Sequence, residues 1–171
     1  MELNKIFEER FSVRSFKDAP IEDEKIQELL KAAQLAPTAH NNQPQRIFVL
    51  KSGEAIEKIR ACTKCAFNAP LVLMICANTD EVWHNRFSGA VSSETDAAIV
   101  TTYMMLKAWD MGLGSCWMVA PVLGESGMRK VLNLNDDEKI VSILAIGKPA
   151  IDATDKRSPK KSLDEIMEII E

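Results

Sequence analysis

The chain has 171 residues, a formal net charge of -4 and an isoelectric point near 5.3. This length suits one domain over residues 1–171, and the acidic balance argues against general affinity for nucleic acid, which needs a basic face. The charged start MELNKIFEER lacks the apolar core of a secretory signal, and the longest apolar run, LVLMICA at 71–77, is too short to cross a bilayer. We therefore expect a cytoplasmic protein with reduced cysteines and neither a nucleic-acid nor a membrane partner.

The first half of the chain alternates helical and strand-like patterns. Leu3, Ile6 and Phe7 fit one face of a short first helix, and EDEKIQELLKAAQLA predicts a second helix over 22–36 that stops at Pro37. The polar loop TAHNNQPQ follows. After it we expect a strand RIFVL at 46–50, a short helix EAIEKIRAC at 54–62, and at 71–77 a central strand that is covered on both faces.

The second half continues the alternation. Segment 78–93 is polar but carries Trp83 and Phe87, which fit either a lid over a flat ligand or an ordinary surface segment. The pattern over 94–110 predicts a helix that is apolar nearly all round, as in a buried or interface helix, and Gly112 and Gly114 are expected to end it. Further elements are predicted in SCWMVAP (a strand), SGMRKVLNL (a helix) and IVSILAIG (a strand), so the fold class is α+β around one sheet.

Several short motifs favour structural rather than catalytic roles. GLGS at 112–115 follows a helix, whereas a dinucleotide-binding glycine loop follows a strand, so a helix cap is the favoured interpretation. CTKC at 62–65 has redox or zinc spacing, but it closes a helix and has no second ligand pair, so Cys62 and Cys65 are expected to be ordinary thiols. His40 and His84 have no nucleophile motif beside them. We expect no metal site and assign no catalytic side chain.

Two basic clusters are unusual in an acidic chain. ERFSVRSF carries Arg10, Ser12 and Arg14 within five positions, and KRSPKK at 156–161 places four cations in six residues. Each cluster alone fits a solvated segment. Together they could meet around one phosphate, with arginines giving forked contacts, lysines giving point charges and Ser12 giving a hydroxyl donor.

Four stretches, in order, resemble the nitroreductase family of flavin enzymes. ERFSVRSF resembles its Arg-x-Ser-x-Arg signature, and AAQLAPTAHNNQPQRIFVL its Ala-Pro-Ser-x-x-Asn-x-Gln-Pro-Trp segment. DAAIVTTYMMLKAWDMGLGSCWM resembles its central helix and following strand, and SPKKSLDEIM its basic C-terminal phosphate contact. The resemblance implies a mixed central sheet flanked by helices, an intertwined homodimer, and FMN at the subunit interface. It also implies a ping-pong reaction in which NADH or NADPH reduces the flavin and a nitroaromatic, quinone or related small-molecule acceptor reoxidises it.

The resemblance also implies residue roles. Arg10, Ser12 and Arg14 match positions that hold the FMN phosphate, ribityl chain and ring edge. The loop that reaches the flavin from the partner subunit corresponds to Pro37, Thr38, Ala39 and Asn41, with Gln43 and Pro44 fixing its shape. The strand end along the ring corresponds to Trp117, Met118, Val119 and Ala120. Lys160 and Lys161, with Arg157 as a possible third cation, match the C-terminal phosphate contact.

The family chemistry explains why so few reactive side chains are recognised, since the flavin itself takes and gives the hydride. The chain departs from the family pattern at Gln45, where a Trp is usual, and at Thr38, which replaces Ser but keeps the hydroxyl. Two other functions stay open. One is a flavin-binding or sensing protein with weak turnover, and the other is a thiol-redox or zinc protein built on Cys62 and Cys65.

Overall fold

The structure is a computed structural model that describes residues 2–119 and 124–170. The helices are α1 (Leu3–Glu9), α2 (Asp23–Leu35), α3 (Gly53–Arg60), α4 (Ser93–Asp110) and α5 (Glu125–Leu132). The strands are β1 (Gln45–Leu50), β2 (Leu71–Asn78), β3 (Gly114–Val119) and β4 (Glu138–Gly147). Short 3-10 turns lie at Ala39–Asn41, Lys64–Ala66 and Leu163–Glu165. The helices and strands follow the sequence predictions closely, and the α+β class is confirmed.

The four strands form one sheet in the order β1-β2-β4-β3, and each neighbouring pair is antiparallel. An isolated bridge between Ser12 and Ser115 adds a parallel contact at the outer edge of β3. β2 and β4 are the inner strands, which explains the unbroken apolar run predicted to be central: every residue from Leu71 to Ala77 is buried.

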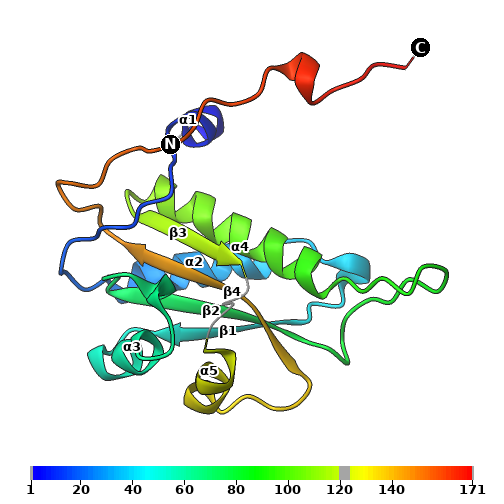
Figure 1. The fold of residues 1–171 in the computed structure, drawn as a ribbon, viewed down its shortest axis with the longest axis horizontal. Coiled ribbons are helices and arrows are strands. Elements are labelled where there is room, and N and C mark those ends of the chain that lie inside the picture. Colours follow the sequence, from blue (N-terminus) through cyan, green and yellow to red (C-terminus); the bar gives the residue numbers. More distant parts are fainter. Residues whose placement is uncertain (1, 120–123, 171) are drawn as a thin grey trace.

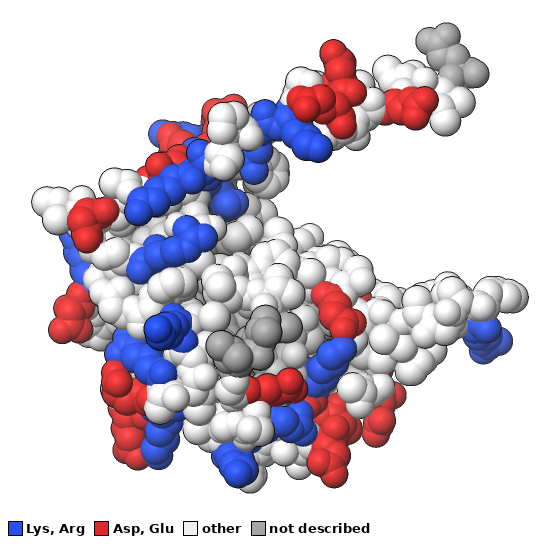
Figure 2. Space-filling model, viewed as in Figure 1, with Lys and Arg blue, Asp and Glu red and all other residues white. Residues whose placement is uncertain are grey.

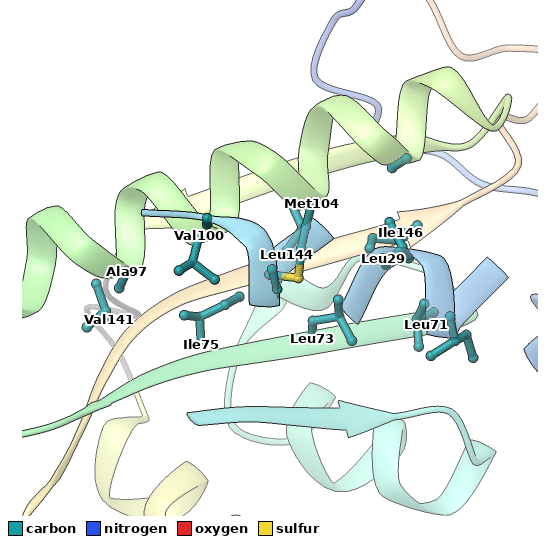
Figure 3. Close-up of a cluster of buried hydrophobic side chains, with 14 of the residues drawn as sticks. Leu29, Leu71, Leu73, Ile75, Ala97, Val100, Met104, Val141, Leu144 and Ile146 are labelled. Atoms are coloured by element: carbon teal, nitrogen blue, oxygen red, sulfur yellow. The ribbon is translucent and has the colours of Figure 1, made fainter. Parts of the chain in front are cut away.

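Helices cover both faces of the sheet (Figure 1). Leu71, Leu73 and Ile75 of β2 pack with α2 and α4, whereas Val72 and Met74 belong to the cluster that includes α3 and α5. This division follows from the two-residue alternation of side chains along a strand. Figure 3 shows the first cluster, in which Leu29 of α2 and Ala97, Val100 and Met104 of α4 meet β2 and β4. Each fully buried aliphatic side chain contributes about 1.5–3 kcal/mol, so the sheet holds α4 firmly in place.

The two glycines after α4 have different roles. Gly112 has φ +74°, the left-handed conformation that ends a helix, as predicted. Gly114 was expected to help end the helix, and this is wrong, because it is the first residue of β3. A Cβ atom on Gly114 would lie 2.6 Å from Val13 Cγ2. Gly114 is therefore needed where residues 10–16 cross the start of β3.

The C-terminal tail leaves the body of the molecule beyond α1 (Figure 1). After residue 150 the tail contains one 3-10 turn, Leu163–Glu165, whose N-terminus is closed by reciprocal bonds between Ser162 and Glu165. Within residues 162–170 of the tail, five apolar side chains are exposed by 50–89%: Leu163, Ile166, Met167, Ile169 and Ile170. Over the described residues, we find no helix with the length and hydrophobicity that a membrane span requires.

Candidate functional site

Residues 10–16 pass the start of β3, where Ser12 bridges to Ser115, and Phe16 then bridges to Pro149 just after β4. The Val13 N–H donates to the Ser115 carbonyl at 2.9 Å, beside the Ser12–Ser115 bridge. Val13 is 1% exposed and packs in the core, whereas Arg14 is exposed. Because side chains alternate along an extended chain, Ser12 and Arg14 share the side opposite Val13. Arg10 caps the end of α1 and is half-buried.

Arg157 ties the C-terminal basic segment to the N-terminal one. Its Nη1 donates to the carbonyls of Glu8 at 2.7 Å and Arg10 at 3.0 Å. Its Nε donates to the carboxylate of Asp155, and this ion pair lowers the pKa of the Asp155 carboxyl and raises the pKa of the guanidinium. Arg157 is thus engaged in joining the two segments, and its suggested contact with a phosphate stays a prediction.

The two basic segments enclose a pocket of about 120 Å³ that is lined by Phe11, Ser12, Arg14, Lys156 and Arg157. Sites for whole ligands usually measure about 300–1,000 Å³, so this pocket has the size and charge for one anionic group of a larger ligand. Lys160 borders a neighbouring hollow, and both Lys160 and Lys161 are exposed. Basic side chains gather where the tail leaves the body (Figure 2). The structure therefore brings the two basic clusters together.

Residues 37–43 form a tight loop just after α2. The Gln43 N–H donates to the Thr38 hydroxyl at 3.0 Å, and the Asn41 N–H donates to the Thr38 carbonyl at 3.0 Å. His40, Asn41 and Gln43 all have positive φ values, between 53° and 56°. Thr38 and Ala39 are half-buried, whereas Pro37, Asn41 and Gln43 are exposed. The buried Pro44 anchors the loop, because its carbonyl accepts from the Asn78 N–H at 2.8 Å.

The first turn of α4 contacts this loop. Asp96 is 2% exposed, and its Oδ1 accepts from the Ala39 N–H at 2.8 Å. Its Oδ2 accepts from the Ser92 hydroxyl at 2.6 Å. The His40 ring stacks on the Trp83 ring, with centroids 5.8 Å apart and planes 11° apart. The loop is therefore held by the segment that leads into α4.

The end of β3 supplies the third predicted group of residues. Trp117 and Met118 are half-buried and face opposite sides of the sheet, and Val119 is 67% exposed. Ala120 lies outside the described residues. The Trp117 Nε1–H is buried and has no hydrogen-bond partner among the described residues. A buried donor normally finds an acceptor, so this atom leaves capacity for a bound group.

The predicted residues divide between the two ends of α4. Ala39 contacts Asp96 in the first turn of α4, whereas Ser12 contacts Ser115 just beyond its last turn. Eighteen helical residues span about 27 Å, and Figure 1 shows α4 lying along the molecule between these ends. One chain therefore does not bring the loop at 37–43 to the basic pocket.

The Nitroreductase family model matches residues 7–71 and 62–148. The chain belongs to the nitroreductase family. A crystal structure of a nitroreductase family protein from Clostridium difficile 630 is 31% identical, covers 98% of each chain and gives a TM-score of 0.89. A structure described as an FMN-dependent nitroreductase from Clostridium difficile R20291 is 26% identical and covers 96% of this chain and 94% of its own, with a TM-score of 0.72. A Thermus thermophilus relative named NADH dehydrogenase is 29% identical, covering 82% of this chain and 83% of its own.

The four thiols of this nitroreductase family member are free cysteines. Cys62 and Cys65 are half-buried and unbridged, and the Cys62 thiol donates to the Lys58 carbonyl at 3.4 Å. Burial raises the pKa of the Cys76 thiol to about 12 and also raises that of Cys116. Within residues 2–119 and 124–170, no three His, Cys, Asp or Glu side chains gather as metal ligands would. These observations favour packing roles for the thiols.

Sequence reasoning missed two residues that shape the site. Asp155 pairs with Arg157 beside the pocket, and Asp96 holds the loop at 37–43. Lys156, which lines the pocket, belongs to the predicted KRSPKK cluster. Asp96 carries only the weak signal of an acidic residue in a first helical turn, since its partner Ala39 is 57 residues away.

Proposed function

We propose that this chain is an FMN-dependent oxidoreductase that uses NADH or NADPH to reduce nitroaromatic, quinone or related small-molecule acceptors. The observation that carries the proposal is the meeting of the Arg10–Arg14 segment with the 156–161 segment around a small cationic pocket, in a chain of the nitroreductase family. The FMN-dependent relative and the relative named NADH dehydrogenase support the choice of cofactor and reductant. One such unit would span residues 1–171.

The residues present fit FMN. Arg14 and Lys156 line the pocket and would give cationic side chains to a phosphate, and Ser12 would give a hydroxyl. Arg10, at the end of α1 just before these residues, would add a further cation. Lys160 and Lys161 lie on the exposed segment that follows and would add charge to the same group. Trp117 and Met118 would lie along the ring, with Val119 and Ala120 continuing the strand end. The unpartnered Trp117 Nε1–H offers one donor to the bound molecule.

When bound, FMN supplies the capacity to accept a hydride and pass it on, so the protein needs no nucleophile of its own. The chain contributes positive charge for the phosphate, an extended strand for the ring and a preformed loop for its edge. These groups would orient the cofactor and leave one face for the reactants. We infer a ping-pong order because the nicotinamide and the acceptor would use that same face in turn.

We further propose a homodimer in which each flavin site is shared. Pro37, Thr38, Ala39, Asn41 and Gln43 would reach the cofactor held by the partner subunit, because they lie at the opposite end of α4 from the basic pocket of their own chain. The exposed apolar side chains of the tail support the same proposal, since contiguous exposed apolar surface marks interaction sites.

The visible spectrum of the purified protein, recorded during titration with NADH and with NADPH, tests this function. We expect a flavin band that either nucleotide bleaches and that an added quinone or nitroaromatic restores. Bound FMN that neither nucleotide reduces would favour a flavin-binding or sensing protein. Colourless protein that takes up no added FMN, so that none remains after the free flavin is removed, would refute the proposal.

The phosphate contacts make a separate prediction. Arg10→Ala and Arg14→Ala each remove a charge-assisted contact, which costs about 1.5–3 kcal/mol, or roughly tenfold to a hundredfold in FMN affinity. Fluorescence titration of flavin-free protein measures the effect. Lys58→Ala is the control, because it removes an exposed cation from α3, which is paired there with Glu54. Wild-type affinity in both arginine variants would show that the pocket is not the phosphate site.

A further inference from the structure

We propose that Asp96 is a positioning residue that holds the loop at 37–43 in the shape that contacts flavin. This inference rests on the proposed function. Asp96 itself would not touch the cofactor, because it is 2% exposed and both carboxylate oxygens already accept hydrogen bonds within the chain. Its effect would pass through the backbone of Ala39.

The loop needs such a support because its backbone is strained. His40, Asn41 and Gln43 adopt positive φ values that side-chain-bearing residues disfavour. Such conformations persist where several contacts with the surrounding structure hold them in place, and they are frequent at ligand-binding sites. The internal bonds to Thr38 set the turn, but they do not fix its place on the protein.

Among the described residues, two hydrogen bonds made by residues 37–43 join the loop to the rest of the fold, in addition to the Asn78–Pro44 bond just after it. The Ala39 N–H donates to Asp96, and the Asn42 side-chain amide donates to the Glu81 carbonyl at 2.9 Å. Only the first ends on a buried carboxylate, and a charge-assisted bond in a buried place is the stronger kind. The Ala39 N–H would otherwise be a half-buried donor with a lost partner.

Asp96 also links the loop to the segment at 83–92. The Ser92 hydroxyl donates to Asp96 Oδ2 at 2.6 Å and accepts from the Trp83 N–H at 3.0 Å. The Ser92 N–H donates in turn to the Trp83 carbonyl at 3.0 Å. The His40 ring also stacks on the Trp83 ring. The loop and this segment are therefore joined both by ring stacking and by the hydrogen bonds through Asp96 and Ser92. The Asp96 carboxylate thus accepts the Ala39 N–H from the loop and the Ser92 hydroxyl from this segment.

The test compares Asp96→Ala and Asp96→Asn with the control Thr101→Val. Asparagine keeps an acceptor for Ala39 and a group that can bond Ser92, whereas alanine removes both. Thr101 is a matched control because it is fully buried on α4, and its hydroxyl bonds the Ala97 carbonyl at 2.7 Å and Ser142 Oγ at 3.1 Å. Its loss should destabilise the fold without reaching the loop.

The first measurement is hydrogen exchange of the Ala39 amide in flavin-free protein. We expect protection in the wild type, Asp96→Asn and Thr101→Val, and at least roughly tenfold faster exchange in Asp96→Ala. The second is the FMN dissociation constant, expected to rise about tenfold in Asp96→Ala and less than about threefold in the other two variants. Should Asp96→Ala fail to fold, Ser92→Ala takes its place, because it removes the bond that orients the Asp96 carboxylate. We then expect faster exchange of the Ala39 amide and a larger rise in the FMN dissociation constant than in Thr101→Val, and equal values in the two variants would overturn the positioning role.

The outcomes separate this inference from the proposed function. Wild-type protein that binds no FMN refutes the function, and the exchange of the Ala39 amide still reports whether Asp96 holds the loop. If the wild type binds FMN and Asp96→Ala weakens binding no more than Thr101→Val does, the positioning role is overturned. Protection of Ala39 that survives Asp96→Ala would overturn it as well.

Discussion

At the scale of single residues, Gly114 connects the fold to the proposed phosphate site. A Cβ there would lie 2.6 Å from Val13 Cγ2, so Gly114→Ala should push residues 10–16 off β3. We expect a loss of about 1–3 kcal/mol in the free energy of unfolding and weaker FMN binding. Chemical denaturation and flavin titration measure the two effects.

Gly112→Ala is the matched control for this prediction. Gly112 is left-handed, so alanine costs about 1–2 kcal/mol there, but an added Cβ has nothing within 4 Å among the described residues. Stability should fall by a similar amount while FMN affinity stays unchanged. Equal FMN affinity in both glycine variants would show that Gly114 has no effect on the flavin site.

The ion pair between Lys139 and Glu94 gives a pH-dependent prediction. The bond from Lys139, followed by that from the Ser93 hydroxyl, lowers the pKa of Glu94 from 4.5 to about 2. A lowered folded-state pKa stabilises the protein above the unfolded value of 4.5, and this contribution is lost as the pH falls toward 2. Both side chains are about half exposed, so Lys139→Met should cost only about 0.2–1 kcal/mol at pH 7.

Denaturation by urea at pH 7, 4 and 2.5 checks this sign. The gap between the wild type and Lys139→Met should be full at pH 7, smaller at pH 4 and smallest at pH 2.5, because Glu94 loses its charge as the pH falls through about 2. A gap that stays constant over this range would mean that the variant acts through packing and not through the charge of Glu94.

At the scale of elements, hydrophobic periodicity was enough to predict most of the helices and strands. The predicted strand at 71–77 and helix at 94–110 differ from β2 and α4 by one residue each, because buried faces impose periods of 2 and 3.6. The antiparallel order of the strands was not readable, since it depends on pairings between distant segments. The role of Gly114 was missed for the same reason, because its neighbour Val13 is about 100 positions away.

In the candidate site too, local sequence patterns predicted some features and long-range contacts determined the others. Residue types and spacing indicated the two basic clusters, and the structure brings them together. Spacing could not reveal that Arg157 is already bonded to Asp155 and to two carbonyls, or that Asp96 supports Ala39. Local patterns identify chemical groups, whereas their partners follow from tertiary packing.

At the scale of the whole molecule, α4 separates the two halves of the proposed site. The loop at 37–43 lies by its first turn and the basic pocket beyond its last, about 27 Å away along the helix axis. Two chains related by a two-fold axis, with their α4 helices antiparallel, would bring the loop of each to the pocket of the other. Flavin binding should therefore depend on dimer formation.

Deleting residues 162–171 tests this dependence and keeps the proposed phosphate contacts Lys160 and Lys161. The deletion removes the five exposed apolar side chains within residues 162–170, each contributing about 1.5–3 kcal/mol if the partner buries it. We expect the dimer dissociation constant, measured by analytical ultracentrifugation, to rise at least about 100-fold, with FMN affinity falling in parallel.

The full-length chain with those five residues changed to serine should behave alike, because the apolar contact and not the backbone is what the partner would bind. A truncated chain that stays dimeric at nanomolar concentration would show that another surface holds the dimer. A monomer that still binds FMN at wild-type affinity would show that one chain completes the site.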